Sequence, residues 1–252
     1  MKPFLFNRIQ NDEILDRCKK MHLPMIDTPY TYKGYKVPRV TSVLADMLNE
    51  EYLITWANNV GLFQRKKHTY YRNKATTIGS AVHNAIEEKM QFQIDPDFVG
   101  IKDAKDRLAA SQSYNAFSSW WSIVENKSRI ILEEYTLITE YCGGTLDLLI
   151  NINGKLYLLD FKTSSQMSFK YYVQLAAYRR MLYDLLGYIV DGVIVLRLDK
   201  KTGRYEESVL DFSVYDDLLF IEQCDSLFIS ILYGYYCRSM VESSKFIKRG
   251  IM

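Results

Sequence analysis

The sequence lacks the closely spaced cysteines of a structural metal site. Its four cysteines are scattered, and no two form a CxxC pair. Zinc and iron–sulfur sites are built from closely spaced thiolates, so we expect neither a zinc site nor an iron–sulfur cluster. Scattered, unpaired cysteines are typical of reduced thiols in the cytosol. The residues concerned are Cys18, Cys142, Cys224 and Cys237.

Long hydrophobic runs are also missing. No stretch approaches the roughly 18 consecutive apolar residues that a membrane-spanning helix needs. Charges interrupt the first segment, MKPFLFNRIQNDEILDRCKK, and its acidic residues Asp12, Glu13 and Asp16 are unlike a signal or transit peptide. We therefore expect a cytoplasmic protein without a membrane partner.

An excess of charge of one sign is absent as well. The 32 basic and 30 acidic residues give a formal net charge of +2. This balance neither indicates nor excludes a nucleic-acid partner, because a local basic stripe can matter more than the total. With 252 residues, 48% of them hydrophobic, the chain has ample material for a core.

The hydrophobic spacing predicts helices first and then a helix–strand alternation. We expect helices over residues 5–20, 41–64 (capped by Thr41 or Ser42), 75–91, 103–126, 168–186 and 214–240. A hairpin is expected within residues 30–40, and strands over 129–138, 144–152, 155–162, 190–198 and 205–210. The central order of helix, three strands, helix and strand indicates a mixed α/β class.

Two aspartates interrupt the apolar runs on either side of Asn153-Gly154, a strong signal for a two-residue hairpin turn. With these two residues as the turn, facing positions have numbers that sum to 307. Asp147 and Asp160 then lie opposite each other, and Lys162 points to the same face as Asp160. A slip of one residue would separate them.

Facing carboxylates need compensation. At a separation of about 5 Å and an effective dielectric of about 20, they repel by roughly 3 kcal/mol. A divalent cation such as Mg²⁺ offsets this repulsion best, because it takes carboxylate oxygens as ligands. The alternative is a buried pair of Asp160 with Lys162 and a spare Asp147 near the strand end.

Two helical segments carry polar residues four positions apart, on one helix face. His83 and Glu87 stand in IGSAVHNAIEEKM, and Gln174 and Tyr178 stand in KYYVQLAAYRRM. Taken alone, His83 is more typical of a satisfied helix histidine than of a metal ligand, and the pair of Gln174 and Tyr178 is more typical of ordinary helix surface.

Together, these segments resemble the RecB-like exonuclease branch of the PD-(D/E)XK nuclease superfamily. They look most like its small phage exonucleases and mitochondrial genome maintenance exonucleases. The family pattern of GxxxH, a strand glutamate, GxxD, D/ExK and QxxxY is matched, in order, by Gly79–His83, Glu134, Gly144–Asp147, Asp160–Lys162 and Gln174–Tyr178. Glu133 is an alternative to Glu134. The match covers roughly residues 37–180.

The resemblance implies a restriction-endonuclease-like core with a central mixed sheet flanked by helices, in α-β-β-β-α-β order. We expect an N-terminal helical and hairpin region (1–74) that packs as one unit with the nuclease domain (75–252). It further implies Mg²⁺ or Mn²⁺ ions held by His83, Glu134, Asp147, Asp160 and the carbonyl of Phe161. Lys162 would orient the attacking water, and Gln174 and Tyr178 would contact the DNA or brace Lys162.

A basic and aromatic segment, RKKHTYYRNK, precedes this core. Cations follow phosphates and aromatic rings stack on unpaired bases, so we expect single-stranded DNA to lie here and exonucleolytic cleavage from its ends. A solvated basic loop is the plain alternative. The expected contacts are Arg65, Lys66, Lys67, Tyr70, Tyr71, Arg72 and Lys74.

Two other functions fit the same residues. An endonuclease on flapped or branched DNA would use the same metal centre. A nucleic-acid-binding recombination accessory protein would keep the fold without the chemistry, although the intact Asp–Asp–Lys set argues against it. The compact chain without a helicase region favours a phage or another mobile element as its source.

Overall fold

The computed structural model describes residues 4–21, 26–48 and 68–244. Its helices are α1 (Phe4–Lys20), α2 (Val40–Met47), α4 (His68–Phe92), α5 (Ala104–Val124), α6 (Phe169–Leu186) and α7 (Tyr215–Glu242), with a 3₁₀ turn at Glu125–Lys127. Its strands are β1 (Thr31–Tyr32), β2 (Tyr35–Lys36), β3 (Ser128–Ile138), β4 (Gly143–Ile152), β5 (Lys155–Lys162), β6 (Gly192–Leu198) and β7 (Tyr205–Asp211).

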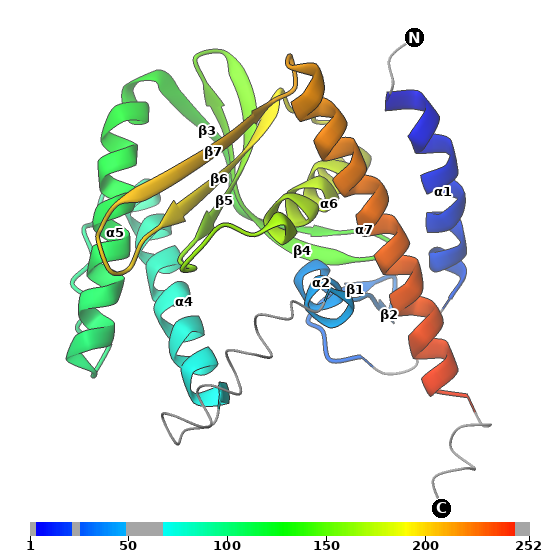
Figure 1. Ribbon diagram of the computed structural model, residues 1–252, viewed down its shortest axis with the longest axis horizontal. Helices are drawn as coiled ribbons and strands as arrows, with labels where there is room; N and C mark the ends of the chain where they lie inside the picture. Colours follow the sequence, from blue (N-terminus) through cyan, green and yellow to red (C-terminus); the bar gives the residue numbers. More distant parts are fainter. Residues whose placement is uncertain (1–3, 22–25, 49–67, 245–252) are drawn as a thin grey trace, which may run out of the picture.

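The expected α/β class, with a central mixed sheet flanked by helices, is confirmed. Five strands pair in the order β3-β4-β5-β6-β7, and only β5 and β6 run parallel, joined through α6. One hydrophobic cluster joins the sheet to α4 and α5, and a second joins its other face to α1, α2, α6 and α7. Figure 1 shows the two helical layers on either side of the sheet.

The central strands are apolar almost throughout because helices cover both faces of the sheet. Side chains alternate along β4, so Leu148 and Ile150 pack toward α4 and α5 while Leu149 packs toward α6 and α7. On β5, Leu158 packs toward α6 and α7, and Leu159 packs toward α4 and α5. A polar residue in these strands is therefore in contact with a helix rather than with bulk water.

The hairpin predicted at Asn153-Gly154 is confirmed, with positive φ angles of 52° and 86° at the two turn residues. Five Cα pairs, from Ile152↔Lys155 to Leu148↔Leu159, follow the predicted register. The recorded pairing ends there, one position before Asp147 and Asp160. The two aspartates thus lie at the end of the β4–β5 ladder.

The start of α4 differs from the prediction. The helix begins at His68, not at Ala75, so the expected boundary between residues 74 and 75 falls inside a helix. Lys74 explains part of the extension, because its ammonium lies 2.8 Å from an Asp106 carboxylate oxygen and 3.3 Å from one of Asp103. These ion pairs fix this turn of α4 against the start of α5.

The ends of α2 also differ. Arg39 precedes the helix in extended conformation without a side-chain cap, so neither Thr41 nor Ser42 is the cap. Arg39 forms a bridge to Gly143 of β4, which keeps it extended and lets the helix begin at Val40. The helix ends at Met47, where the Lys170 ammonium donates to the carbonyl of Leu48. Residues 49–64 of the expected helix lie outside the described residues.

One predicted core residue of α5 was wrong. Phe117, Trp120 and Trp121 are buried as expected, but Leu108 is 59% exposed. Nine residues separate Leu108 from Phe117, which corresponds to two and a half helical turns and places them on opposite faces.

Helix α7 is the one described helix whose length and apolar composition would allow it to cross a membrane. Its most apolar window has a mean hydropathy of 1.2, and 44% of that window is buried inside the protein. A core helix of a soluble protein has the same properties, and α7 packs against α1, α2 and α6.

Two tyrosine rings occupy the space left by the glycines that begin β4. A Cβ atom on Gly143 would overlap the ring of Tyr30, and one on Gly144 would overlap the ring of Tyr178. Tyr178 is buried and comes from α6. The pair of glycines therefore sets how closely α6 and the segment before β1 approach the strand that carries Asp147.

We expect Gly144→Ala to destabilise the protein by roughly 1–3 kcal/mol, because the added methyl group forces Tyr178 out of a packed position. Urea unfolding measures this. Gly100→Ala is the control, since a Cβ there meets nothing within 4 Å. Equal unfolding midpoints for the two variants would show that the contact of Tyr178 with Gly144 does not hold α6 in place.

Candidate metal centre

Acidic residues of three neighbouring strands gather where the ladder of β4 and β5 ends. The pairs Glu133↔Leu148 and Tyr135↔Leu146 leave Glu134 opposite Asp147 between β3 and β4. Continuing the β4–β5 register places Asp160 on the other side of Asp147. Three acids in adjacent strand positions repel one another, so the structure must compensate their charge.

Glu134 departs from strand geometry. Its φ of 42° lies in the left-handed region, which costs a non-glycine residue about 1–3 kcal/mol. Adjacent side chains of a regular strand point to opposite faces of the sheet, but Glu133 and Glu134 both approach α4. Glu134 contacts His83, whereas Glu133 interacts with Glu87 and Gln91. The local twist brings Glu134 to the histidine.

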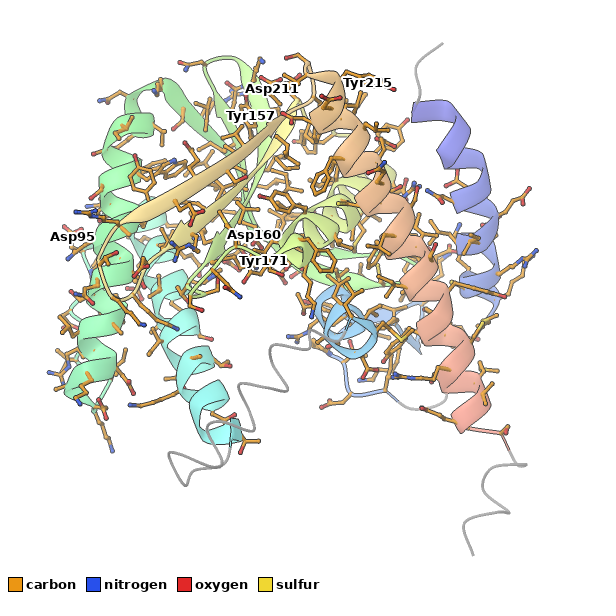
Figure 2. The ribbon with its side chains drawn as sticks, viewed as in Figure 1. Asp95, Tyr157, Asp160, Tyr171, Asp211 and Tyr215 are labelled. Carbon is orange, nitrogen blue, oxygen red and sulfur yellow. The ribbon has the colours of Figure 1, made fainter. Side chains whose placement is uncertain are left out.

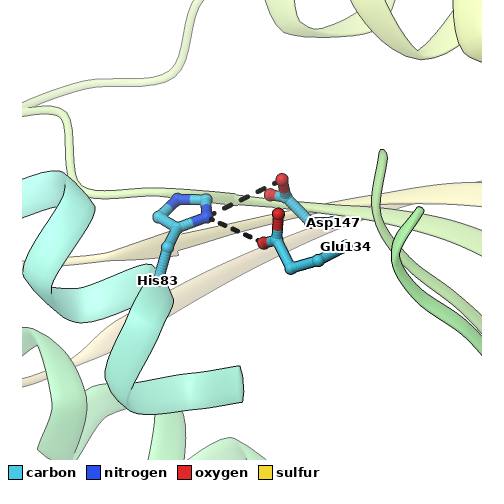
Figure 3. A group of neighbouring side chains, drawn as sticks. All are labelled: His83, Glu134 and Asp147. Atoms are coloured by element: carbon cyan, nitrogen blue, oxygen red, sulfur yellow. Dashed lines mark ion pairs between the residues drawn. The ribbon is translucent and has the colours of Figure 1, made fainter. Parts of the chain in front are cut away.

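His83, Glu134 and Asp147 form a group that could hold a metal ion (Figure 3). The His83 Nδ1 atom lies 3.7 Å from Glu134 Oε1 and 3.7 Å from Asp147 Oδ1. One ligand atom from each of the three residues lies within 4.8 Å of the other two. Two carboxylates and one imidazole suit Mn²⁺, which accepts nitrogen as well as oxygen ligands. Mg²⁺ prefers oxygen ligands, and the two carboxylates supply these.

The electrostatics of this group favour a positive charge. Burial disfavours the imidazolium form of His83, but the carboxylates of Asp147 and Glu134 outweigh it and raise the pKa of His83 to about 9. The His83 Nε2 atom lies 3.2 Å from the carbonyl oxygen of Phe161, which can only accept a hydrogen bond. Nε2 therefore carries the proton of this contact, and Nδ1 faces the acids.

Asp160 lies on the α6 side of the same strand end and is 1% exposed. Its Oδ1 atom accepts hydrogen bonds from Lys162 Nζ at 2.8 Å and from Gln174 Nε2 at 2.9 Å. Its Oδ2 atom lies 2.6 Å from the same ammonium as an ion pair but accepts no hydrogen bond. Burial raises the pKa of Asp160 against the opposing effect of Lys162.

Lys162 is held from several sides. Its ammonium lies 3.3 Å from Gln174 Oε1 and 5.2 Å from the centre of the Tyr171 ring. Burial lowers the pKa of Lys162, but the carboxylates of Asp160 and Asp147 raise it above its usual value, so the amine stays charged. Figure 2 shows Tyr171 beside Asp160 at the start of α6.

Tyr171 was not among the residues expected at the site. The sequence contained an indication of it, because Tyr171 precedes Gln174 by three residues and therefore shares its helix face.

Asp147 connects the two groups. Its Oδ2 atom accepts a hydrogen bond of 2.7 Å from the backbone N–H of Phe161, while Oδ1 faces His83. The single ion shared by Asp147 and Asp160 was expected, but among the described residues the group of potential ligands contains Glu134 and His83 with Asp147 and not Asp160. Asp160 forms an ion pair with Lys162 and accepts a hydrogen bond from Gln174 of α6.

The remaining expected site residues have different surroundings. The Phe161 carbonyl oxygen lies 3.2 Å from His83 Nε2. The Gln174 Oε1 atom lies 3.3 Å from the Lys162 ammonium, which is compatible with the expected bracing of Lys162. Tyr178 is only 3% exposed and packs on Gly144, so it supports β4 instead of presenting a surface for DNA.

Most residues of the basic segment RKKHTYYRNK have no described side chain. Arg65, Lys66 and Lys67 lie outside the described residues. Tyr70, Tyr71 and Arg72 belong to the backbone of α4, but their side chains are not among those described. Lys74 is described, and its ion pairs with Asp103 and Asp106 neutralise the charge expected for DNA.

Comparisons with known proteins give distant structural likenesses, two of which are described here. No family model matches the chain, and no curated protein matches its sequence. The crystal structure of the protein SSO0001 is similar over 87% of this chain and 85% of its own, at 13% identity and a TM-score of 0.31. A phage-related exonuclease from Haemophilus somnus 129PT is similar over 83% of this chain and 97% of its own, at 11% identity and a TM-score of 0.37. At these TM-scores neither likeness carries an argument about this chain.

We expect Mn²⁺ to raise the melting temperature of the protein by several degrees, because an ion that binds only the folded state adds about 2.7 kcal/mol at 100 times its Kd. Glu134→Gln should lose most of this shift, since it removes one of the gathered carboxylates. Differential scanning calorimetry with Mn²⁺ or EDTA measures both.

Glu88→Gln is the matched control, because Glu88 is exposed on α4 and does not belong to the group. An equal Mn²⁺ shift in both variants would rule out Glu134 as a ligand.

Proposed function

We propose that the protein is a metal-dependent deoxyribonuclease of the PD-(D/E)XK type. The observation that supports it best is the meeting of two groups at one strand end. A cluster of two carboxylates and an imidazole (His83, Glu134 and Asp147) adjoins a buried Asp160–Lys162 ion pair. A bound cation and a positioned charged donor each lower the barrier to phosphodiester hydrolysis by stabilising charge on the phosphate, and the two groups are suited to these two roles.

The residues present fit a divalent ion. His83, Glu134 and Asp147 would hold it, and their crowded negative charge requires such compensation. Asp160, whose Oδ2 atom lies 2.6 Å from the Lys162 ammonium, is a further candidate ligand beside this group. When bound, Mg²⁺ or Mn²⁺ lowers the pKa of a coordinated water and neutralises charge on the phosphate.

The chain itself supplies the orientation of the reacting groups. Lys162 is charged, has three N–H donors, and is held by Asp160, Gln174 and Tyr171. In this function its ammonium positions the attacking water and stabilises the negative charge that develops on the phosphate oxygens. The water oxygen loses a proton and forms a bond to phosphorus as the bond to the leaving 3′ sugar oxygen breaks and that oxygen takes up a proton, which gives 5′-phosphate and 3′-hydroxyl ends.

The preferred substrate is single-stranded DNA cut from its ends. This choice is supported by the basic and aromatic composition of residues 65–74 and by the resemblance of the motif set to RecB-like exonucleases. Helices α4 and α5 pack together on one face of the sheet, and α4 carries His83, so this layer is suited to guide a strand toward the candidate metal centre.

We expect Lys162→Ala and Asp160→Ala each to abolish metal-dependent cleavage, with losses of at least 100-fold, because each removes a charged group next to the phosphate. End-labelled single- and double-stranded DNA, digested with Mg²⁺, Mn²⁺ or EDTA, reports chemistry, polarity and strand preference together.

Lys127→Ala is the control, since Lys127 is exposed on the 3₁₀ turn before β3. Circular dichroism verifies that the two site variants are folded. If the folded variants kept full activity, the site would be rejected; if the wild-type protein bound DNA but did not cut it with Mn²⁺, the accessory-protein function would be favoured.

A circular single strand separates exonuclease from endonuclease. We expect the protein to leave circular single-stranded DNA intact and to degrade the same molecule after linearisation, because an enzyme that starts at ends finds none in a circle. Gel electrophoresis of the two forms after matched digestion measures this. Cutting of the circle at the rate of the linear form would identify an endonuclease.

A further inference from the structure

A pocket with a volume of about 190 Å³ lies between the end of α1, the β1–β2 hairpin and α7, and none of the candidate metal-centre residues lines it. Its lining combines basic and aromatic side chains, of which the important ones are Lys19, Lys33, Lys36, Tyr32, Tyr35 and Glu140. Figure 1 shows the hairpin beside α2 and α7, near the lower end of α1.

The charge of this pocket is positive. Lys19 already pairs with Asp16 at 2.8 Å, and Glu140 accepts a hydrogen bond of 2.9 Å from the Tyr32 hydroxyl. Within the described part of the chain, the recorded contacts of Lys33 and Lys36 are the Tyr32 ring and the carbonyl of Thr28, respectively, and neither is a carboxylate. These two ammonium groups therefore make the pocket suitable for an anion.

The backbone at Lys33 is unusual for a lysine. Lys33 and Gly34 form a two-residue turn with φ angles of 46° and 88°, and the first of these favours asparagine or glycine. Another two-residue turn, at Asn153-Gly154, has Asn153 at the corresponding position, with a φ of 52°. Lysine thus occupies a position where asparagine would be less strained, and its ammonium lies over the Tyr32 ring, 5.1 Å from the centre.

The hairpin is fixed to the strand that carries the metal centre. Gly143 donates a backbone hydrogen bond of 2.9 Å to Pro38, and the Tyr30 hydroxyl lies 3.2 Å from Thr145 Oγ1. Four residues of β4 separate Gly143 from Asp147, which is about 14 Å at the rise of an antiparallel strand.

We propose that this pocket is a second contact for a single nucleic-acid strand, with Lys33 and Lys36 at a phosphate and Tyr35 stacked on an unpaired base. Tyr35 is 55% exposed at the rim, and aromatic rings bind bases of any sequence. The choice of a nucleic acid as the ligand rests on the proposed nuclease function, while the basic and aromatic pocket does not.

The test uses the full chain and a fluorescent single-stranded oligonucleotide in EDTA, where cleavage does not interfere. Fluorescence anisotropy over a range of salt concentrations measures affinity. Lys33→Asn should weaken binding several-fold and reduce the slope of log K against log salt by about 0.7, the value for one phosphate contact on a single strand. Its melting temperature should be unchanged or higher, because asparagine suits the turn.

Lys102→Asn is the matched control, since it makes the same charge change at an exposed position outside the pocket. Tyr35→Ala should weaken binding of the single strand more than that of a duplex of the same sequence. An unaltered affinity and salt slope in Lys33→Asn, or equal losses in Lys33→Asn and Lys102→Asn, would overturn the proposal.

Cleavage assays keep the two proposals apart. With a long single-stranded substrate, Lys33→Asn should raise KM and leave kcat unchanged. Normal cleavage with an unaltered KM would reject the pocket alone. Absence of cleavage by the wild-type protein, together with weaker binding by Lys33→Asn, would reject the nuclease and keep the pocket as a nucleic-acid site.

Discussion

The end of the β4–β5 ladder beyond Leu148 and Leu159 is the constraint on which the candidate site depends. If pairing continued, Asp147 and Asp160 would face each other on one surface of the sheet and repel. Instead, Asp147 accepts a hydrogen bond from the backbone of Phe161 and turns its other oxygen to His83. Asp160 keeps its place on the α6 side and pairs with Lys162. The strand end thus divides three adjacent acids into two groups. Asp160 pairs with the Lys162 ammonium, while Glu134 and Asp147 gather with His83 at the candidate cation site.

Helices on both faces of the sheet contribute side chains to the candidate site, because a single sheet separates the two helical layers. The α4 layer supplies His83, and the α6 layer supplies Gln174 and Tyr171. Glycines at the start of β4 allow Tyr30 and Tyr178 to pack against the strand, which fixes its distance from α6 and from the β1–β2 hairpin. The segment before the β1–β2 hairpin and the strand that carries Asp147 are therefore held together by the packing of Tyr30 on Gly143 and by the hydrogen bond from Gly143 to Pro38.

Positive charge is distributed in two ways. At the candidate metal centre it is partly buried and compensated, with Lys162 beside Asp160 and a histidine whose pKa is raised to about 9 by two carboxylates. At the hairpin it is exposed and lacks carboxylate partners among the described residues, as suits a transient contact with phosphates. The near-neutral total of the chain conceals this division, since 32 basic residues are set against 30 acidic ones.

The sequence alone determined the α/β class, the hairpin at Asn153-Gly154 and its register, because turn chemistry and alternation are local properties. It also indicated His83, Glu134 and Asp147, although as members of a larger ligand set. Tertiary structure decided which acids meet, since the left-handed Glu134 and the end of the ladder depend on packing against α4 and α6. It also decided the pairing of Lys74 and the pocket at Lys33, because contacts between distant segments leave no periodic signal in the chain.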